Sequence, residues 1–417
     1  MASYVICGGS RLCGDMFVQG SKNAALPILA AALLNDGVTT LENCPDILDV
    51  RHMIKIIESV GCLVERKGHQ IIIHGGNVDV SSMRIDYVSK MRSSVILLGA
   101  LLGRKGKVSI PYPGGCTIGK RPVDLHLSAL RKMNVAIEES NGMIHCFTKG
   151  ISGCDIVLAY PSVGATENII LAAVLAKGTT TIHNPAKEPE VVDLCGFLNA
   201  LGARVTGIGT ETLVVEGVEH LKNNISYEIM ADRIVAGTYM MAAAATGGNI
   251  RLLNVKEEDI RSIIRTLMYM GCSFNIQGTR IQLFSPEKMF PVDYICTEPF
   301  PGFPTDMQSQ LMSSLTTVEG ESCIVENVFE DRFKTAGELK KMGAKIELSQ
   351  NEARITGVKA LKGARVTAMD LRGGAALVLA GLMAEGETVV EDTSFIERGY
   401  EDICRDLKAL GAQIKMI

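Results

Sequence analysis

The stretch Ser59-Val-Gly-Cys-Leu-Val64 decides the fold, because close copies of it return along the whole chain. Four further copies share its apolar residue, its glycine and its strand-like tail: Leu201-Gly-Ala-Arg-Val205, Met270-Gly-Cys-Ser-Phe274, Met342-Gly-Ala-Lys-Ile346 and Leu410-Gly-Ala-Gln-Ile414. A degenerate sixth copy is Lys132-Met-Asn-Val-Ala136. Successive copies lie roughly 70 residues apart, and a repeat of fixed period indicates one structural unit used six times.

Each repeat contains the same order of predicted elements. A helix rich in Ala, Leu and Met leads into a strand such as Gly178-Thr-Thr-Thr-Ile-His-Asn184, and a second, amphipathic helix precedes the glycine turn. Two more strands follow, as in Leu213-Val-Val-Glu-Gly217. This alternation predicts an α/β fold with three units in each of two lobes. A closed solenoid without a binding site is the alternative, and the residues at equivalent positions of the repeats discriminate between the two.

The composition is typical of a large protein without a membrane segment. A chain of 417 residues exceeds a single core and favours two domains of about 200 residues. The apolar run from Ala24 to Leu34 is far shorter than the ~20 residues of a membrane span, and the N-terminus lacks the plan of a signal peptide, so a cytoplasmic protein is expected. The net charge of −4, without a run of Lys or Arg, argues against nucleic acid or an anionic membrane as partner.

The cysteines and histidines predict neither a metal site nor a disulfide framework. The 12 cysteines include no Cys-x-x-Cys pair, and the 7 histidines are scattered. We therefore expect reduced thiols, most of them buried.

One loop stands apart from the repeats, Tyr112-Pro-Gly-Gly-Cys-Thr-Ile-Gly-Lys-Arg-Pro-Val-Asp-Leu-His126. Its prolines and glycines disfavour both a helix and a central strand, so Cys116 is expected on an exposed, mobile loop. The neighbouring Lys120 and Arg121 are expected to lower the pKa of this thiol from its usual value of about 8.5. Such a thiol can serve as an acid or a nucleophile, whereas the alternative is a loop cysteine without a role.

Cations recur where helices are predicted to start: Lys22, Arg92, Arg121, Arg233, Arg332, Arg372 and Arg398. A positive charge is unfavourable at a helix N-terminus unless an anion joins it. Several of these side chains are therefore expected to face a shared phosphate or carboxylate ligand. Carboxylates at other helix starts, such as Glu188, Glu190 and Asp259, are interpreted as ordinary helix-stabilising residues.

The segment around Lys22 makes the prediction specific. Pro27 lacks an N–H and is tolerated in a first turn, so the helix through Leu34 is expected to begin near Asn23 or Ala24. Lys22 and the Asn23 amide would then lie just ahead of free backbone N–H groups, an arrangement that suits a phosphate.

Five motifs in register carry a resemblance to a known family: Ser21-Lys-Asn-Ala-Ala-Leu-Pro27, the cysteine loop, Phe303-Pro-Thr-Asp-Met-Gln308, Phe329-Glu-Asp-Arg-Phe333 and Glu397-Arg-Gly-Tyr400. Through them the chain resembles, from end to end, the UDP-N-acetylglucosamine 1-carboxyvinyltransferases of the enolpyruvyl transferase family. The resemblance implies a two-lobed inside-out α/β barrel around a cleft. Residues 22–229 would form the first lobe, with the Cys116 loop, and residues 1–21 and 230–417 the second, with Asp306, Arg332, Arg372 and Arg398.

The resemblance also implies an activity. Members transfer enolpyruvyl from phosphoenolpyruvate to the 3'-hydroxyl of UDP-N-acetylglucosamine and release phosphate, as the first committed, cytosolic step of peptidoglycan synthesis. The two substrates would be the partners, no metal or organic cofactor is expected, and the oligomeric state stays open. Two alternatives are the sibling 3-phosphoshikimate 1-carboxyvinyltransferase, whose pattern lacks this cysteine loop, and a non-catalytic UDP-sugar-binding paralogue with a regulatory role.

Carried over by motif, the roles fall on named residues. Cys116 would donate a proton to the methylene carbon of phosphoenolpyruvate, and Asp306 would accept the proton of the sugar hydroxyl. Lys22, Arg121 and Arg398 resemble the phosphoenolpyruvate clamp. The other implied contacts are Arg92, Arg332 and Arg372 for positive field, Asn23 for the amino sugar, and Arg121, Pro122, Val123, Asp124, Leu125, Ser162, Val163, Gly164 and Val328 for the nucleotide. Tyr160 departs from the family, since members can carry a lysine there.

Overall fold

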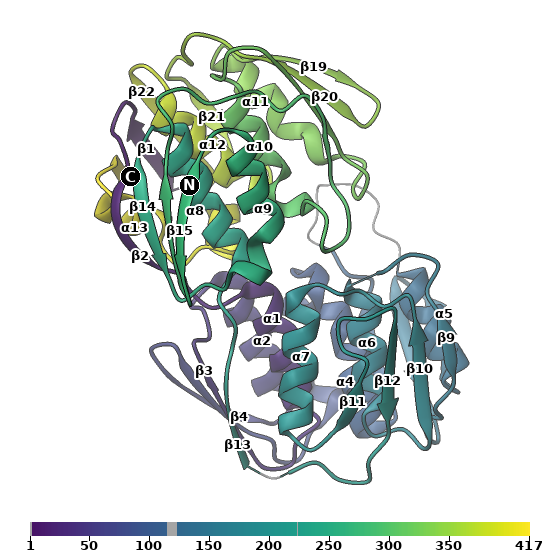
Figure 1. Cartoon of the computed structure of the whole chain (residues 1–417). Helices are drawn as coiled ribbons and strands as arrows, with labels where there is room; N and C mark the ends of the chain where they lie inside the picture. The colour runs from purple at the N-terminus through teal and green to yellow at the C-terminus, as the bar shows by residue number, and fades with distance from the viewer. Residues whose placement is uncertain (1, 115–122, 223) are drawn as a thin grey trace. The chain divides into compact units, whose positions relative to one another are not determined.

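The computed structural model describes residues 2–114, 123–222 and 224–417. Its described residues divide into two compact units, shown with the element labels in Figure 1. The first lobe runs from Gly20 to Met230, and the second lobe combines the chain up to Gln19 with Ala231–Ile417. Among the described residues, no helix combines the length and the hydropathy that a membrane crossing needs.

Three units follow one another in the first lobe, each with a helix, a strand, a second helix and a hairpin. The first unit consists of α1 (Lys22–Ala32), β3 (Val38–Glu42), α2 (Leu48–Ser59), β4 (Leu63–Lys67) and β5 (Gln70–His74). The second consists of α4 (Leu97–Lys105), β6 (Lys107–Pro111), α5 (Asp124–Lys132), β7 (Ala136–Ser140) and β8 (Met143–Phe147). The third consists of α6 (Val163–Ala173), β10 (Thr179–His183), α7 (Pro189–Ala200), β11 (Arg204–Thr206) and β12 (Thr212–Glu216).

The second lobe repeats this order three times. Its first unit consists of α8 (Arg233–Ala245), β14 (Asn249–Leu253), α9 (Glu257–Tyr269), β15 (Ser273–Gln277) and β16 (Arg280–Phe284). The next consists of α10 (Gln308–Leu315), β18 (Glu321–Val325), α11 (Thr335–Lys341), β19 (Lys345–Ser349) and β20 (Glu352–Thr356). The last consists of α12 (Leu371–Met383), β22 (Glu387–Glu391), α13 (Ile403–Ala409) and β23 (Gln413–Met416), and its missing hairpin strand is β1 (Ser3–Cys7) from the start of the chain.

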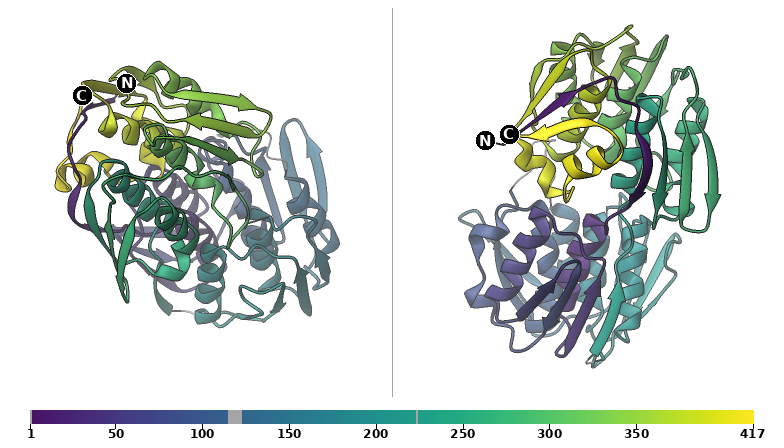
Figure 2. Two further views of the ribbon diagram at one scale, coloured as in Figure 1. Left: turned by 45° about the horizontal axis from the view of Figure 1, so that its top comes forward. Right: turned by 90° about the vertical axis from the view of Figure 1, so that its left-hand side faces the viewer.

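β1 closes the sixth unit by pairing with both β22 and β23. The backbone N–H of Ser3 donates to the carbonyl of Ile417 at 3.0 Å, and Ile417 donates back at 2.9 Å. The two chain ends therefore lie side by side, as both views of Figure 2 show. The second lobe thus depends on residues from both ends of the sequence.

A fourth, parallel strand completes five of the six sheets. These strands are β13 (Asn224–Glu228), β9 (Asp155–Val157), β2 (Cys13–Phe17), β17 (Ile295–Cys296) and β21 (Arg365–Thr367). In the sheet of β6, β8 and β7 the described residues contribute three strands. The short helices η1 (Val80–Ser82) and α3 (Ile85–Val88) precede that sheet, and the other short helices are η2 (Arg92–Ile96), η3 (Thr305–Met307), η4 (Arg332–Lys334) and η5 (Thr393–Arg398).

The helices lie inside and the sheets outside within each lobe, which confirms the inside-out fold (Figures 1 and 2). The first helix of each unit is buried nearly all round, as α6 and α12 illustrate, because it is apolar on every side. Each lobe has its own apolar core.

The repeated glycine has a backbone reason. Gly61, Gly202, Gly271, Gly343 and Gly411 follow the second helix of their units with φ between 91° and 103°, a region that L side chains rarely adopt. The degenerate copy places Asn134 there with φ of 67°, and asparagine tolerates this conformation better than other residues with a side chain. The sequence repeat therefore marks the turn that ends the second helix in every unit.

Candidate active site

Asp306 is the centre of a charged cluster in the second lobe. Its Oδ1 accepts a hydrogen bond from Nη2 of Arg332 at 2.7 Å, and its Oδ2 accepts one from Nη2 of Arg372 at 2.9 Å. Both arginine side chains are buried, while the Asp306 side chain keeps 26% of its surface exposed. Two guanidinium groups fix the orientation of the carboxylate and favour its ionised form.

The cluster forms where the short helix η3 meets the starts of η4 and α12. Asp306 lies on η3, Arg332 begins η4, and Arg372 is the second residue of α12. The side chain of Asp370 caps α12 by accepting from the backbone N–H groups of Arg372 and Gly373. The anion expected at these helix starts is therefore, in part, a carboxylate of the chain itself.

Arg372 stays charged although it is buried. Burial disfavours its charged form, but Asp306, Tyr400 and Asp232 outweigh that effect and raise the pKa of the guanidinium. Tyr400 is also buried, which raises the pKa of its phenol, and the hydroxyl lies 2.8 Å from Oγ1 of Thr238.

Arg398 and Val328 also belong to the second lobe. Arg398 is the last residue of η5, and α13 begins only at Ile403, so the expectation that Arg398 lies at a helix start is wrong. Val328 follows β18 and donates its backbone N–H to Oε1 of Glu326 at 2.8 Å. Glu326 was not predicted as a site residue.

Lys22 is the charged centre of the first lobe. Its Nζ lies 2.8 Å from Oδ2 of Asp49, and both side chains are buried. Lys22 is the first residue of α1, and Ser21 caps the helix by accepting from the backbone N–H of Ala24 at 3.3 Å. The helix therefore begins one residue earlier than Asn23, and the cap in front of it is a serine hydroxyl.

Pro27 lies within α1 rather than in its first turn, which corrects the sequence-based argument. Proline has no N–H to donate and leaves the carbonyl four residues earlier, that of Asn23, without its helical partner. Asn23 is the second residue of the helix and is only partly buried. The backbone of this turn is therefore less saturated with hydrogen bonds than a regular helix.

Six of the residues expected to contact the nucleotide lie at two neighbouring helix starts of the first lobe. Val123 precedes α5, whose first residues are Asp124 and Leu125, and Ser162 precedes α6, whose first residues are Val163 and Gly164. Gly164 lies so close to His126 that an added Cβ would meet the imidazole Cε1 at 3.0 Å. The structure thus brings Asp124, Leu125 and Ser162 to Gly164 together, with the 41% exposed Tyr160 just before them.

The remaining predicted residues are placed in part. Arg92 begins η2 and donates from Nη1 to the carbonyl of Pro113 at 3.2 Å, next to the cysteine loop. Cys116, Arg121 and Pro122 lie outside the described residues. Among the other cysteines six are buried, two are exposed and three are intermediate, and none of them forms a disulfide within the described chain.

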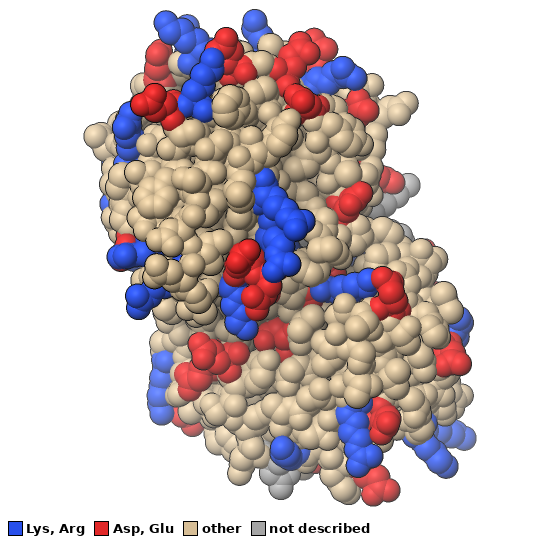
Figure 3. All heavy atoms as spheres, viewed as in Figure 1, with Lys and Arg blue, Asp and Glu red and all other residues tan. Residues whose placement is uncertain are grey.

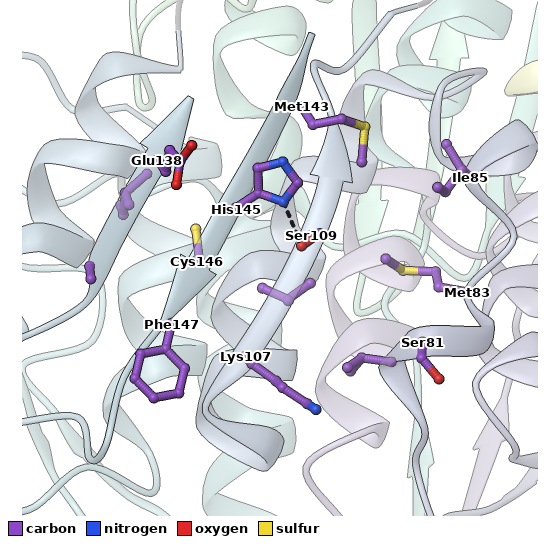
Figure 4. A pocket seen from close by; sticks show the side chains of 14 residues that line it. Ser81, Met83, Ile85, Lys107, Ser109, Glu138, Met143, His145, Cys146 and Phe147 are labelled. Atoms are coloured by element: carbon purple, nitrogen blue, oxygen red, sulfur yellow. Dashed lines mark hydrogen bonds between the residues drawn. The ribbon is translucent and has the colours of Figure 1, made fainter. Parts of the chain in front are cut away.

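A groove of about 610 Å³ lies over the three-stranded sheet, and none of the predicted site residues that the structure describes lines it (Figure 4). Its lining includes Ser109, whose Oγ is 2.9 Å from Nδ1 of His145, with Met83 and Ile85 on the facing side. The edge strand β6 begins with Lys107 and ends with Pro111, and lysine and proline on an edge strand discourage the addition of another strand to the sheet. We interpret Ser109 and His145 as a polar cross-strand pair.

Two further observations concern the surface charge and the residues that could bind a metal ion. On the face shown in Figure 3, Lys and Arg are interspersed with Asp and Glu among the described residues, so this face carries no continuous basic stripe. Within the ranges that the structure describes, no group of three or more His, Cys, Asp or Glu side chains could hold a metal ion.

Sequence reasoning missed three residues that support the predicted ones: Asp49, Glu326 and Tyr400. Asp49 and Tyr400 lie in segments that the sequence had marked, but a carboxylate at a helix start and a buried phenol gave no separate signal. Glu326 could have been found by aligning the repeats, because asparagine occupies its position in three other units.

Comparisons with known proteins found relatives that match over the whole chain. The sequence model of the family described as EPSP synthase (3-phosphoshikimate 1-carboxyvinyltransferase) matches residues 6–407. A protein of Caldanaerobacter subterraneus subsp. tengcongensis named UDP-N-acetylglucosamine 1-carboxyvinyltransferase 2 is 48% identical over 417 residues, which cover 100% of both chains. A UDP-N-acetylglucosamine 1-carboxyvinyltransferase of Cellvibrio japonicus is 43% identical over 419 residues and also covers 100% of both.

Solved structures share the fold. The enolpyruvyl transferase NikO from Streptomyces tendae superposes with a TM-score of 0.90 at 25% identity, covering 100% of this chain and 99% of that one. An EPSP synthase from Acinetobacter baumannii reaches a TM-score of 0.75 at 18% identity over 100% of both chains, a likeness of fold alone.

Proposed function

The chain belongs to the family of UDP-N-acetylglucosamine 1-carboxyvinyltransferases, and on that premise we propose that it transfers enolpyruvyl from phosphoenolpyruvate to the 3'-hydroxyl of UDP-N-acetylglucosamine. The other product is inorganic phosphate. The observation that carries the proposal is the 48% identity to a relative of that name over the full length of both chains. The sibling activity on shikimate 3-phosphate is less well supported, because the structure of that name is only 18% identical.

The reaction requires a proton at one carbon and a nucleophile at the next. Protonation of the methylene carbon of phosphoenolpyruvate builds positive charge on the adjacent carbon, which the sugar oxygen attacks as its own proton leaves. Loss of phosphate and of a proton from the new methyl group then restores the double bond in the product. Acid and base must be separate groups, and we assign them to Cys116 and Asp306.

The contacts of Asp306 support its assignment as the base. A carboxylate held by Arg332 and Arg372 on different oxygens is oriented, and its partial exposure leaves room for a hydroxyl. Arg332 and Arg372 place two positive charges beside this carboxylate, where they would favour an anionic substrate group. Lys22, Arg121 and Arg398 remain the proposed phosphoenolpyruvate clamp.

We assign the nucleotide to the starts of α5 and α6, with Asn23 and Val328 as further contacts. Helix starts present backbone N–H groups that suit a diphosphate. A cytoplasmic location and a role in peptidoglycan synthesis, cell shape and division belong to the same proposal.

The test is phosphate release in a mixture of both substrates. We expect release that depends on UDP-N-acetylglucosamine and is not supported by shikimate 3-phosphate. Binding of the UDP-sugar without any phosphate release would instead favour the regulatory paralogue. Release with shikimate 3-phosphate as acceptor would favour the sibling enzyme.

A further inference from the structure

Glu326 is a buried carboxylate that four donors hold. Its Oε1 accepts from Oγ1 of Thr297 at 2.8 Å and from the backbone N–H groups of Val328 and Phe329 at 2.8 and 3.0 Å. Its Oε2 accepts from Oγ1 of Thr305 at 2.9 Å. The residue is 3% exposed. A carboxylate bonded in this way is firmly oriented and, in turn, fixes the segments that donate to it.

This position departs from the pattern of the repeats. The residue that directly follows the first strand of a unit is an asparagine with left-handed backbone in three other units: Asn43, Asn184 and Asn254. Each of these amides donates to the carbonyl that ends the parallel neighbour strand, at Ile229, Leu158 and Val18 respectively. Glu326 takes this place after β18, and Thr297 is the matching residue after β17.

The departure adds a connection that an asparagine could not make. The glutamate side chain is one methylene longer and reaches beyond the neighbouring strand to Thr305. Thr305 directly precedes Asp306, and Val328 lies two residues after Glu326. One buried carboxylate thus joins the segment of the proposed base to the segment of a proposed nucleotide contact.

We propose that Glu326 is a positioning residue, which sets the place of Asp306 through the hydroxyl of Thr305. The inference rests on the proposed function, because it assumes that Asp306 acts on the sugar hydroxyl. A misplacement of about 1 Å in a reacting group can reduce the rate roughly 10²-fold. Breaking this connection should therefore slow turnover more than it weakens substrate binding.

Thr305→Val and Thr305→Ser form the central pair of variants. Valine matches the shape of threonine but cannot donate to Glu326, so we expect kcat to fall about 10- to 100-fold while KM for UDP-N-acetylglucosamine stays within about twofold. Serine keeps the hydroxyl and should restore kcat to within about twofold of the wild type. Wild-type turnover by Thr305→Val would overturn the inference.

Glu326→Asn separates positioning from folding. Asparagine is the residue that other units of this chain use at the same place, and its side chain can still accept from the Val328 N–H, so the melting temperature should change by less than about 4 °C. It is too short to reach Thr305, so kcat should fall as in Thr305→Val. Adding Thr305→Val to this variant should cost nothing further, because both changes break one connection. Independent, multiplicative losses would overturn the inference.

Glu338→Gln is the matched control. Glu338 is also a buried glutamate of the second lobe and accepts from Lys341 at 2.7 Å and from the Thr367 N–H at 3.0 Å. Its loss should lower the melting temperature and leave kcat within about twofold of the wild type, as expected for a residue that only stabilises the fold. A fall of kcat as large as that of Glu326→Asn would assign the effect of both to general destabilisation and overturn the inference.

Two further readouts keep this inference distinct from the proposed function. The absence of phosphate release by the wild type would refute the function itself, whereas an active wild type with a normal Thr305→Val refutes only the role of Glu326. A crystal structure of Thr305→Val shows the position of the Asp306 carboxylate independently of any activity measurement. The inference requires the Asp306 carboxylate to shift from its pairing with Arg332, and an unchanged position would contradict it.

Discussion

The proposed role of Asp306 as the base can be tested by replacing its carboxylate. Its carboxylate accepts from Arg332 and Arg372 on different oxygens, and a neutral amide of the same shape can keep one of these two bonds through its remaining oxygen. We expect Asp306→Asn to bind the UDP-sugar almost as well as the wild type and to lose turnover by ~10² to 10⁴-fold, because an amide cannot accept the proton. Calorimetry and phosphate release measure the two effects separately.

Asp331→Asn is the control for this prediction. Asp331 is exposed, lies next to Arg332 in the sequence and pairs with Lys334 at 3.5 Å. It should keep wild-type turnover. A loss of affinity in Asp306→Asn as large as its loss of rate would make Asp306 a binding residue instead of a base.

Cys116 should tolerate only another acid. A serine hydroxyl is too weak an acid to protonate carbon near neutral pH, so Cys116→Ser should be inactive, whereas Cys116→Asp should be partly active. The thiolate should also open the epoxide of fosfomycin, with formation of a carbon–sulfur bond and protonation of the ring oxygen. We expect time-dependent inactivation that is faster with UDP-sugar present, and resistance in Cys116→Asp.

Mass spectrometry of the adduct provides the control for this reaction. Burial raises the pKa of Cys146, Cys195 and Cys272 to about 12, so these thiols should not react. Cys7 and Cys13 are exposed and report non-specific alkylation. An inactivating adduct on any other cysteine, with Cys116 unmodified, would contradict the assignment.

Glu167 should give stability a pH dependence. It is buried in α6, and burial, with the nearby Glu190 and Glu188, raises the pKa of its carboxyl well above the usual value. The folded state therefore binds this proton more tightly than the unfolded state, so its contribution is full below about pH 4 and is lost as pH rises through the folded pKa. Glu167→Gln imitates the protonated form, and its stability relative to the wild type should grow between pH 5 and 8.

Urea denaturation at several pH values measures this difference. The exposed Glu219→Gln removes one charge without removing a buried carboxyl, and its difference from the wild type should change little with pH. A pH-independent difference for Glu167→Gln would mean that the buried carboxyl does not titrate as inferred.

At the scale of elements, one side chain of α6 joins three neighbours. Asn168 is fully buried, accepts from the Gly99 N–H at 2.7 Å, donates to the Val95 carbonyl at 2.9 Å and lies 2.7 Å from Nδ1 of His126. α4 approaches α6 so closely that a Cβ on Gly99 would meet the Asn168 carbonyl oxygen at 2.3 Å. The inner helices therefore depend on this contact.

Asn168→Ala should destabilise the first lobe by roughly 2 to 4 kcal/mol, because at least two buried backbone groups lose their partner. Urea denaturation followed by circular dichroism measures the change. The exposed Asn77→Ala should stay within about 0.5 kcal/mol of the wild type. An equal, small effect in both variants would show that water satisfies the freed groups of α4 and η2.

At the scale of the whole molecule, the two lobes differ in how the chain builds them. The core of the first lobe uses residues from Ala24 to Ile229, one continuous segment. The core of the second combines Tyr4 to Val18 with Ile234 to Ile414. Within the second lobe, β1 pairs with β22 and β23, and β2 pairs with β14.

This difference predicts the behaviour of fragments. A chain of residues 20–230 should fold by itself with a cooperative thermal transition, because it contains its whole core. Residues 231–417 without 1–19 should lack that transition, since two of their sheets lose a strand. Calorimetry of both fragments tests this. A cooperative transition in the second fragment alone would show that β1 and β2 are dispensable for that lobe.

The features that depend on local chemistry can be read from the sequence. The turn after each second helix needs a left-handed residue, so glycine or asparagine returned at a period that revealed six units, and from them the α/β order. The motifs around Lys22, Asp306 and Arg398 then pointed to the family and to the proposed residues. These signals are readable because each lies within a few neighbouring positions.

Which charged side chains pair with each other became clear only from the fold. Arg372 lies 66 residues from Asp306 along the chain. Lys22 and Asp49 lie on different helices, α1 and α2. No local pattern could therefore show that carboxylates of the protein pair with these cations. Glu326, which follows β18, accepts from Thr305 at the start of η3, a partner 21 residues away that only the tertiary fold brings near. Pairings of this kind depend on how separate elements pack, because charge interactions act through space and not along the sequence.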